Sequence, residues 1–203
     1  IPESSDVSDV INIIGVANVS LWHGYDRVIK GLGEYYRQDS DSRPKVIFHI
    51  VGARLPYLDE LRELVSQENV IHSVVFHEPR QGKSLDSLFM NCHLAVGVLG
   101  GHRKGLETMS PLKNREYCAR GIPFIFSHVD PDFSEDFKYC LRTTSDESPV
   151  SIQNLISFIS QLSREDGVAS KMRDYAHSSL EWAVKLKPVQ AYIDDQVKKL
   201  SCG

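Results

Sequence analysis

The stretch SPLKNREYCARGIP, residues 110–123, carries the start and stop signals of a short helix. Ser110 is predicted to be the N-cap, because its hydroxyl can accept a hydrogen bond from a free backbone N–H. Pro111 fits the first helical position, where a missing N–H costs nothing. Gly121 predicts a left-handed C-cap, and the apolar run that follows it predicts a strand. The stretch therefore indicates a helix followed directly by a buried strand.

The first turn of this helix contains Lys113, where the helix dipole disfavours a cation. A bound anion would reverse that preference, because free backbone amides and a lysine together form a phosphate site. Glu116 lies one turn further on the same face and could accept hydrogen bonds from sugar hydroxyls. An ordinary surface helix with a Lys113–Glu116 ion pair fits the spacing equally well, so both interpretations stand at this point.

Composition narrows the class of protein. The 203 residues are 41% hydrophobic, which suits one large α/β domain with a sizeable core. The net charge of −4, with acids and bases interspersed, argues against nucleic acid as a partner. The four cysteines lack CxxC spacing and fit a reducing cytoplasm better than a disulfide framework or a zinc site. No signal peptide is visible, and the start at Ile1 leads us to expect a piece of a longer protein.

Apolar runs and helical periodicities alternate along the chain, which predicts a parallel, doubly wound α/β sheet with a helical C-terminal tail. The expected strands are residues 10–17, 45–52, 70–77, 93–99, 122–127 and 139–143. The expected helices are residues 25–36, 57–67, 85–91, 111–120, 152–162, 164–180 and 188–200. Ligands of such sheets bind beyond the carboxyl ends of the strands.

Two loops at that edge carry polar residues. The loop after the first strand contains Asn18, His23 and Gly24. His23 fits either a ligand contact or a simple helix-entry cap, and it would be cationic only near or below its usual pKa of about 6.5. The loop 100–109 is rich in glycine and cations, which fits a ligand-gripping loop and a merely solvated loop equally.

Several common sites are disfavoured, because their motifs are missing. The chain has no GxGxxG, no GxxxxGK[ST], no HExxH and no GxSxG. These absences disfavour a nicotinamide dehydrogenase, a P-loop ATPase, a zinc protease and an α/β-hydrolase. The eight histidines form no metal-ligand pattern, so we expect no metal site.

The segments WHGYDR, FHIVG and SPLKNREYCARGIP, in this order, resemble the donor-binding C-terminal half of GT-B glycosyltransferases, and most closely glycosyltransferase family 4. The resemblance runs from about Asn12 to Ser127. It implies that Glu116 holds the ribose hydroxyls of a nucleotide and that the amides of Leu112 and Lys113 meet the diphosphate. Gly24 matches a family glycine, and Ser110 belongs to the same segment.

The chain departs from the family pattern at two points. Asn18 and His23 stand where the family has an arginine and a lysine, which weakens the usual cationic clamp on the diphosphate. Thr108 stands at the position of a glutamate that contacts the donor sugar, with Glu107 one residue away. The resemblance therefore leaves the sugar, the base and the acceptor open.

The resemblance implies a function both for this chain and for the longer enzyme to which it would belong. Residues 1–203 would form a single domain that binds a nucleotide-diphosphate sugar, and an N-terminal acceptor domain would be missing from this chain. The full enzyme would transfer a hexose with retention, without metal or cofactor, in bacterial surface or capsular polysaccharide synthesis. We expect the isolated domain to be inactive. We expect the enzyme in the cytoplasm or at the inner face of the membrane, where the absent half would make any peripheral membrane contact.

Two other functions remain open on the sequence. A GT-B sugar-nucleotide epimerase would use the same donor half but needs acid/base carboxylates, and release of an epimer rather than transfer would identify it. A non-catalytic, flavodoxin-like interaction domain would need an acidic pocket after the first strand, which residues 18–20 do not offer.

Overall fold

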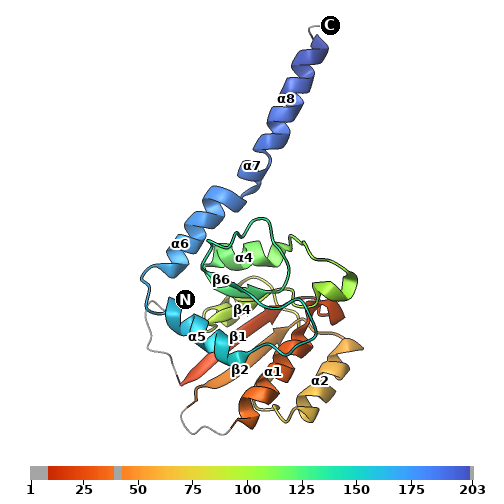
Figure 1. The fold of residues 1–203 in the computed structure, drawn as a ribbon, viewed down its shortest axis with the longest axis vertical. Coiled ribbons are helices and arrows are strands. Elements are labelled where there is room, and N and C mark those ends of the chain that lie inside the picture. Colours follow the sequence, from red (N-terminus) through yellow and green to blue (C-terminus); the bar gives the residue numbers. More distant parts are fainter. Residues whose placement is uncertain (1–8, 39–42, 202–203) are drawn as a thin grey trace.

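The computed structural model describes residues 9–38 and 43–201, and these form one six-stranded, all-parallel sheet flanked by helices (Figure 1). The strand order is β3-β2-β1-β4-β5-β6, which confirms the predicted doubly wound α/β architecture. The strands are β1 Val10–Val16, β2 Lys45–Val51, β3 Val74–His77, β4 Leu94–Val96, β5 Phe124–Phe126 and β6 Cys140–Arg142.

The helices follow the predicted order. They are α1 Tyr25–Arg37, α2 Tyr57–Gln67, α3 Lys83–Phe89, α4 Leu112–Arg120, α5 Ile152–Leu162, α6 Val168–Tyr175, α7 Trp182–Lys185 and α8 Lys187–Ser201. Two short 3-10 turns, η1 Leu21–His23 and η2 Gly101–Lys104, lie in the loops after β1 and β4. A π-helical turn, η3 Ala176–Leu180, follows α6.

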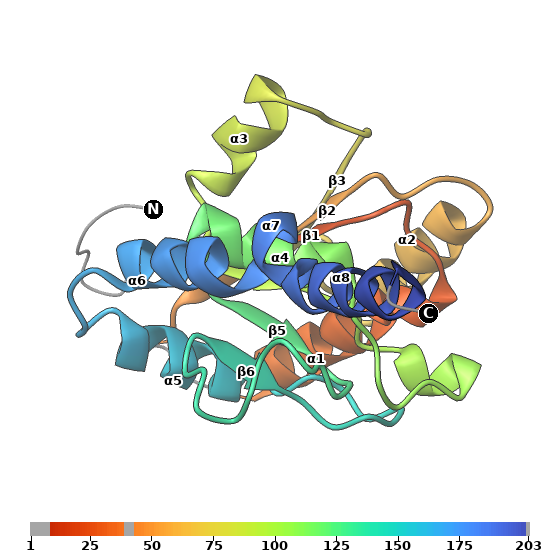
Figure 2. The same cartoon turned by 90° about the horizontal axis from the view of Figure 1, so that it is seen from above.

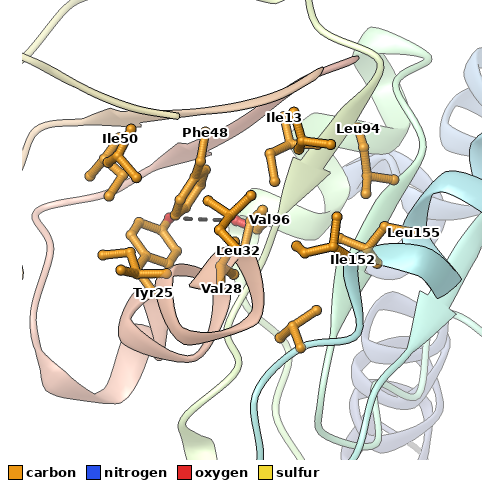
Figure 3. Packing of buried hydrophobic residues seen from close by; sticks show 14 of the residues in the cluster. Ile13, Tyr25, Val28, Leu32, Phe48, Ile50, Leu94, Val96, Ile152 and Leu155 are labelled. Carbon is orange, nitrogen blue, oxygen red and sulfur yellow. Dashed lines mark hydrogen bonds between the residues drawn. The ribbon is translucent and has the colours of Figure 1, made fainter. Parts of the chain in front are cut away.

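Each face of the sheet buries its own apolar cluster. On one face α1, α2 and α5 pack against the strands, and Tyr25, Phe48 and Leu155 belong to this cluster (Figure 3). On the other face α3, α4 and α6 contribute residues such as Phe89 and Met172 (Figure 2 shows the two helical layers). Burial on both faces explains the near-continuous apolar runs of the central strands.

The chain reverses its direction of winding between β1 and β4. Strand β1 pairs along its full length with β2, but with β4 only at Ile13 and Ile14. The strand order switches at these two strands, and in doubly wound folds ligands bind beyond the carboxyl ends at such a switch point. The loops that leave this point carry η1, η2 and the N-terminus of α4.

Some predicted boundaries are wrong for local reasons. Strand β3 starts at Val74 rather than at residue 70, because Asn69 has a positive φ of 58° and a turn precedes the strand, where the Ser73 amide donates to the Val70 carbonyl. The predicted helix 164–180 is divided into α6 and η3. Helix α6 starts only at Val168, because Gly167 has a positive φ of 72° and forms its N-cap. No proline or glycine marks the junction with η3 at Ala176.

Helix α8 extends away from the sheet (Figure 1). Its apolar side chains are exposed; Val189, Ile193 and Val197 are about half accessible to solvent. Among the described residues, no helix has the length and apolar character needed to cross a membrane.

Candidate functional site

Helix α4 begins at Leu112 with Pro111, in extended conformation, as its N-cap. The prediction of Ser110 as the N-cap is therefore wrong. The Ser110 hydroxyl instead accepts a hydrogen bond from Arg115 Nη2 at 3.1 Å, because the guanidinium reaches back over the first turn. The predicted end is confirmed: Gly121 has a φ of 72°, and its amide donates to the Cys118 carbonyl.

The first turn of α4 presents unpaired backbone donors. The opening N–H groups of any helix lack intrahelical partners, and here the Asn114 amide already turns back to the Pro111 carbonyl at 3.2 Å. The amides of Leu112 and Lys113 precede it. The Leu112 side chain is 71% exposed, so this residue offers its backbone rather than its side chain to a ligand.

Asp130 holds this turn in place. Its buried carboxylate accepts hydrogen bonds from Asn114 Nδ2 at 3.0 Å and from both Nη atoms of Arg115 at 2.8 and 2.9 Å. Next to Asp130, the Val129 amide donates to the Glu107 carbonyl at 2.8 Å. The loop after β5 therefore fixes both the entry to α4 and its first turn. Sequence analysis did not identify Asp130, because its contacts with α4 are tertiary.

Lys113 is the unusual residue of this turn. Its Nζ is buried and has no hydrogen-bond partner among the described residues. Burial lowers the pKa of the ammonium to about 7, against a smaller opposing effect of Glu116. The Nζ lies 5.7 Å from the centroid of the Tyr25 ring. A buried cation at a helix N-terminus has two energetic penalties, the loss of its hydration and the repulsion from the helix dipole. An anion beside it would offset both.

Tyr25 places Lys113 at the switch point of the sheet. The Tyr25 hydroxyl donates to the carbonyl of Val96, the last residue of β4, at 3.5 Å. Tyr117 of α4 donates to the same carbonyl at 3.2 Å and accepts from the Val16 amide at 3.4 Å. The two tyrosines thus bind the ends of β1 and β4 beneath the first turn of α4. Sequence analysis singled out neither tyrosine.

Glu116 does not pair with Lys113, so the interpretation as a surface Lys–Glu pair is wrong. Its carboxylate accepts from Arg120 Nε at 3.0 Å, and Arg120 also binds Asp86 at 2.7 Å. The Glu116 side chain is 48% exposed. An arginine four residues away is the nearer partner, because the Lys113 side chain turns inward over Tyr25. Glu116 remains accessible to a ligand at the open face of α4.

His23 is buried and acts as a local cap. Its Nδ1 accepts from the Ser20 amide at 3.0 Å, and its ring stacks on Trp22 with centroids 4.0 Å apart. Burial, and secondarily the charge of Lys113, lower the pKa of His23 to about 3. The imidazole is therefore neutral at physiological pH. A neutral imidazole cannot replace the cationic lysine of the family, so this possible role of His23 is not supported. The sequence did not reveal that His23 is buried.

Gly24 lies where two loops touch. The Leu99 amide donates to the His23 carbonyl at 3.0 Å, and the Gly100 amide donates to the Trp22 carbonyl at 3.2 Å. Gly24 has a φ of 69°, and a Cβ there would lie 2.8 Å from the backbone of Leu99 and Gly100. The glycine thus permits the loop after β1 to lie directly on the loop after β4.

The remaining predicted residues lie at the same edge but are less defined. Asn18 is exposed in the loop after β1. Glu107 is exposed before α4 and is fixed through its carbonyl, beside the parallel bridge between Thr108 and Val129. No group of three or more His, Cys, Asp or Glu residues suited to a metal occurs within residues 9–38 and 43–201.

Comparison with solved structures shows which fold this is. The chain aligns with HepE from Anabaena, solved in complex with UDP, at a TM-score of 0.67 and 17% identity over 93% of this chain and 50% of HepE. It aligns with a glycosyltransferase from Rickettsia africae at a TM-score of 0.69 and 11% identity, over 94% and 49% of the two chains. The fold is that of GT-B glycosyltransferases.

The chain spans about half the length of these two proteins. It also aligns with the C-terminal domain of LpcC, a group 1 glycosyltransferase from Francisella tularensis, at a TM-score of 0.55 and 16% identity. That match covers 85% of this chain and 86% of the LpcC domain. Neither a protein-family model nor a curated protein matches the chain.

The contact at Gly24 predicts a large effect of a single methyl group. Gly24→Ala should lower the free energy of unfolding by about 2–4 kcal/mol, because it adds a steric clash to the cost of a left-handed backbone. Gly105→Ala is the matched control, since Gly105 has a φ of 65° and nothing within 4 Å of its would-be Cβ. It should cost only about 1–2 kcal/mol. Urea denaturation measures both; equal losses would contradict the close contact.

Proposed function

We propose that this chain is the donor-binding half of a glycosyltransferase and that it binds a nucleotide-diphosphate sugar at the N-terminus of α4. The observation that carries the proposal is the buried ammonium of Lys113, which has no hydrogen-bond partner within the described residues and belongs to the same first turn as the open amides. Free amides and a desolvated cation form an anion site, and they do so at the switch point between β1 and β4.

The proposed site assigns a role to each part of α4. The amides of Leu112 and Lys113, with the Lys113 ammonium, bind the diphosphate of the donor and help to stabilise the charge that grows on it when the sugar departs. Glu116, one turn along, accepts hydrogen bonds from the ribose hydroxyls. Asn18, Gly24 and Glu107 border the donor from the neighbouring loops. The presence of UDP in the HepE structure supports a nucleoside diphosphate as the ligand class.

We further propose the finer features that the family resemblance implies. The enzyme belongs to glycosyltransferase family 4 and transfers a hexose with retention of configuration in bacterial surface polysaccharide synthesis. The fixed donors of α4 take the place of a metal or other cofactor. The enzyme works in the cytoplasm or at the inner face of the membrane.

The acceptor half is the proposed partner of α8. Val189, Ile193 and Val197 form an exposed apolar stripe on a helix that leaves the domain (Figure 1). Such a stripe is typical of a helix that packs on another domain. We propose that an N-terminal domain of the same enzyme covers it, and that residues 1–203 alone transfer no sugar.

The pKa of Lys113 predicts how donor binding depends on pH. With a free-state pKa of about 7, the lysine is charged below pH 7 and loses its charge above it, whereas a bound diphosphate keeps it protonated. Affinity for a nucleotide sugar, whose phosphates do not titrate in this range, should therefore fall about tenfold from pH 6 to pH 8. Isothermal titration calorimetry with UDP-glucose, ADP-glucose and GDP-mannose tests this and identifies the base.

Lys113→Arg is the control, because arginine stays charged throughout this range and should give a flat profile. His23 cannot produce the dependence, since its proton is already lost near pH 3. A parent profile as flat as that of the arginine variant would remove Lys113 from the phosphate site.

The role of Glu116 is tested by a double-mutant cycle with the ribose. Glu116→Gln should weaken nucleoside diphosphate binding about ten- to a hundredfold, because the carboxylate accepts from both ribose hydroxyls. A 2′,3′-dideoxy nucleotide should bind the parent poorly and be nearly indifferent to the substitution. Arg120→Gln, which removes the competing partner of Glu116, should not weaken binding. Strictly additive losses would show that Glu116 does not contact the ribose.

A further inference from the structure

Besides Lys113, this edge of the sheet carries an exposed lysine that forms no ion pair with a carboxylate among the described residues. Lys104 is the last residue of η2, its side chain is exposed, and it forms no ion pair in the described part of the chain. Its Nζ lies 4.4 Å from the centroid of the Trp22 ring. A cation–π contact at an exposed position is weak and leaves the ammonium charge available to an anion.

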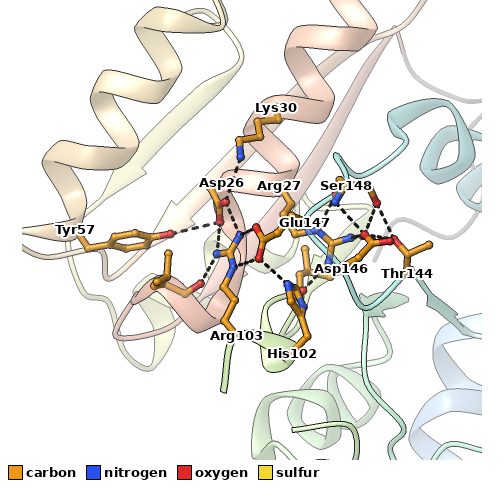
Figure 4. Close-up of polar contacts among 12 residues, drawn as sticks. Asp26, Arg27, Lys30, Tyr57, His102, Arg103, Thr144, Asp146, Glu147 and Ser148 are labelled. Carbon is orange, nitrogen blue, oxygen red and sulfur yellow. Dashed lines mark hydrogen bonds and ion pairs between the residues drawn. The ribbon is translucent and has the colours of Figure 1, made fainter. Parts of the chain in front are cut away.

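The neighbouring cation is fully engaged. Arg103 donates from Nη1 and Nη2 to the two carboxylate oxygens of Asp26 at 2.8 and 2.7 Å, and from Nε to Glu147 at 2.8 Å (Figure 4). Its Nη1 also reaches the Leu21 carbonyl at 2.6 Å. Arg103 therefore cannot turn toward a ligand. It anchors η2 on the loop after β1 and so fixes the backbone from which Lys104 extends.

A row of rings connects Lys104 with the proposed phosphate site. Trp22 stacks on His23 at 4.0 Å, and His23 lies 5.7 Å from Tyr25, whose ring carries the Lys113 ammonium on its face. The charges of Lys113 and Lys104 both lower the pKa of His23, so both ammonium groups lie near the same imidazole. The two cations thus stand at opposite ends of one short row.

A nucleoside diphosphate requires more positive charge than Lys113 provides. Each of its phosphates is negative, and further charge appears on the distal phosphate when the sugar departs. Asn18 is uncharged and His23 is neutral, so the loop after β1 contributes no cation to the second phosphate. A charge-assisted hydrogen bond is stronger than an exposed cation–π contact. The Lys104 ammonium would therefore form a more favourable interaction with a phosphate than with the Trp22 ring.

We propose that Lys104 is a second cation of the donor site, which moves from the Trp22 ring to the distal phosphate of a nucleoside diphosphate bound at α4. The inference rests on the proposed function, because it assumes that the first phosphate lies at Lys113. Under this proposal, Lys104 makes the site bind nucleoside diphosphates more tightly than nucleoside monophosphates.

The test compares Lys104→Gln with the parent by calorimetric titration with UDP, UMP and inorganic pyrophosphate. UDP and pyrophosphate should bind about three- to tenfold more weakly to the variant, the loss of one partly exposed ion pair. UMP affinity should change less than about twofold. Lys104→Arg should restore most of the loss. Lys45→Gln is the matched control, because Lys45 is also an exposed lysine but lies at the amino end of β2, on the opposite edge of the sheet.

The possible outcomes separate the two proposals. A Lys104→Gln variant that binds UDP like the Lys45→Gln control, or that loses UMP and UDP equally, overturns the role of Lys104. Lys113→Met should abolish binding of all three ligands. If it binds UDP like the parent, or if the parent binds none of the three, the proposed function itself fails. Thermal melts that match the parent confirm that Lys104→Gln is folded.

Discussion

The architecture of this edge depends on the close approach of two loops at Gly24. Backbone hydrogen bonds from Leu99 and Gly100 to the loop after β1 leave no room for a Cβ at that position. The buried side chain of Arg27, one turn into α1, strengthens the same junction by donating to the Leu99 carbonyl at 2.6 Å and the Ser148 carbonyl at 2.8 Å (Figure 4). The carboxyl ends of β1 and β4 are thereby joined, and α4 starts directly beside them.

On this rigid frame the chain holds one energetically unfavourable group. The folded-state pKa of Lys113, about 7, lies below its unfolded value of about 10.4, so the residue destabilises the unliganded chain at neutral pH. The penalty shrinks as the pH rises from about 7 toward 10, where the unfolded chain alone still holds the proton. A bound phosphate removes the penalty at neutral pH. Such a loss of stability is expected at a functional site, where a residue that is unfavourable in the free protein is kept because it binds the ligand.

The sequence predicted the elements better than the side-chain contacts. The signals at Gly121 and the apolar runs were local, and they correctly predicted the helix end, a parallel, doubly wound α/β sheet and the position of Lys113 in a first turn. The failures depended on tertiary neighbours: Arg115 takes the hydroxyl of Ser110, and burial under the loops makes His23 neutral. Lys104 could not be singled out, because its relation to Trp22 joins two loops far apart in the sequence.

The central claim is that a phosphate binds at the N-terminus of α4, and the backbone amides there report it most directly. In a 15N-labelled protein titrated with UDP, the amide signals of Leu112 and Lys113 should shift most, because their unpaired N–H groups turn from solvent to phosphate oxygens. The same titration with uridine should leave them in place. Shifts confined to other loops, or equal shifts with uridine, would contradict the account.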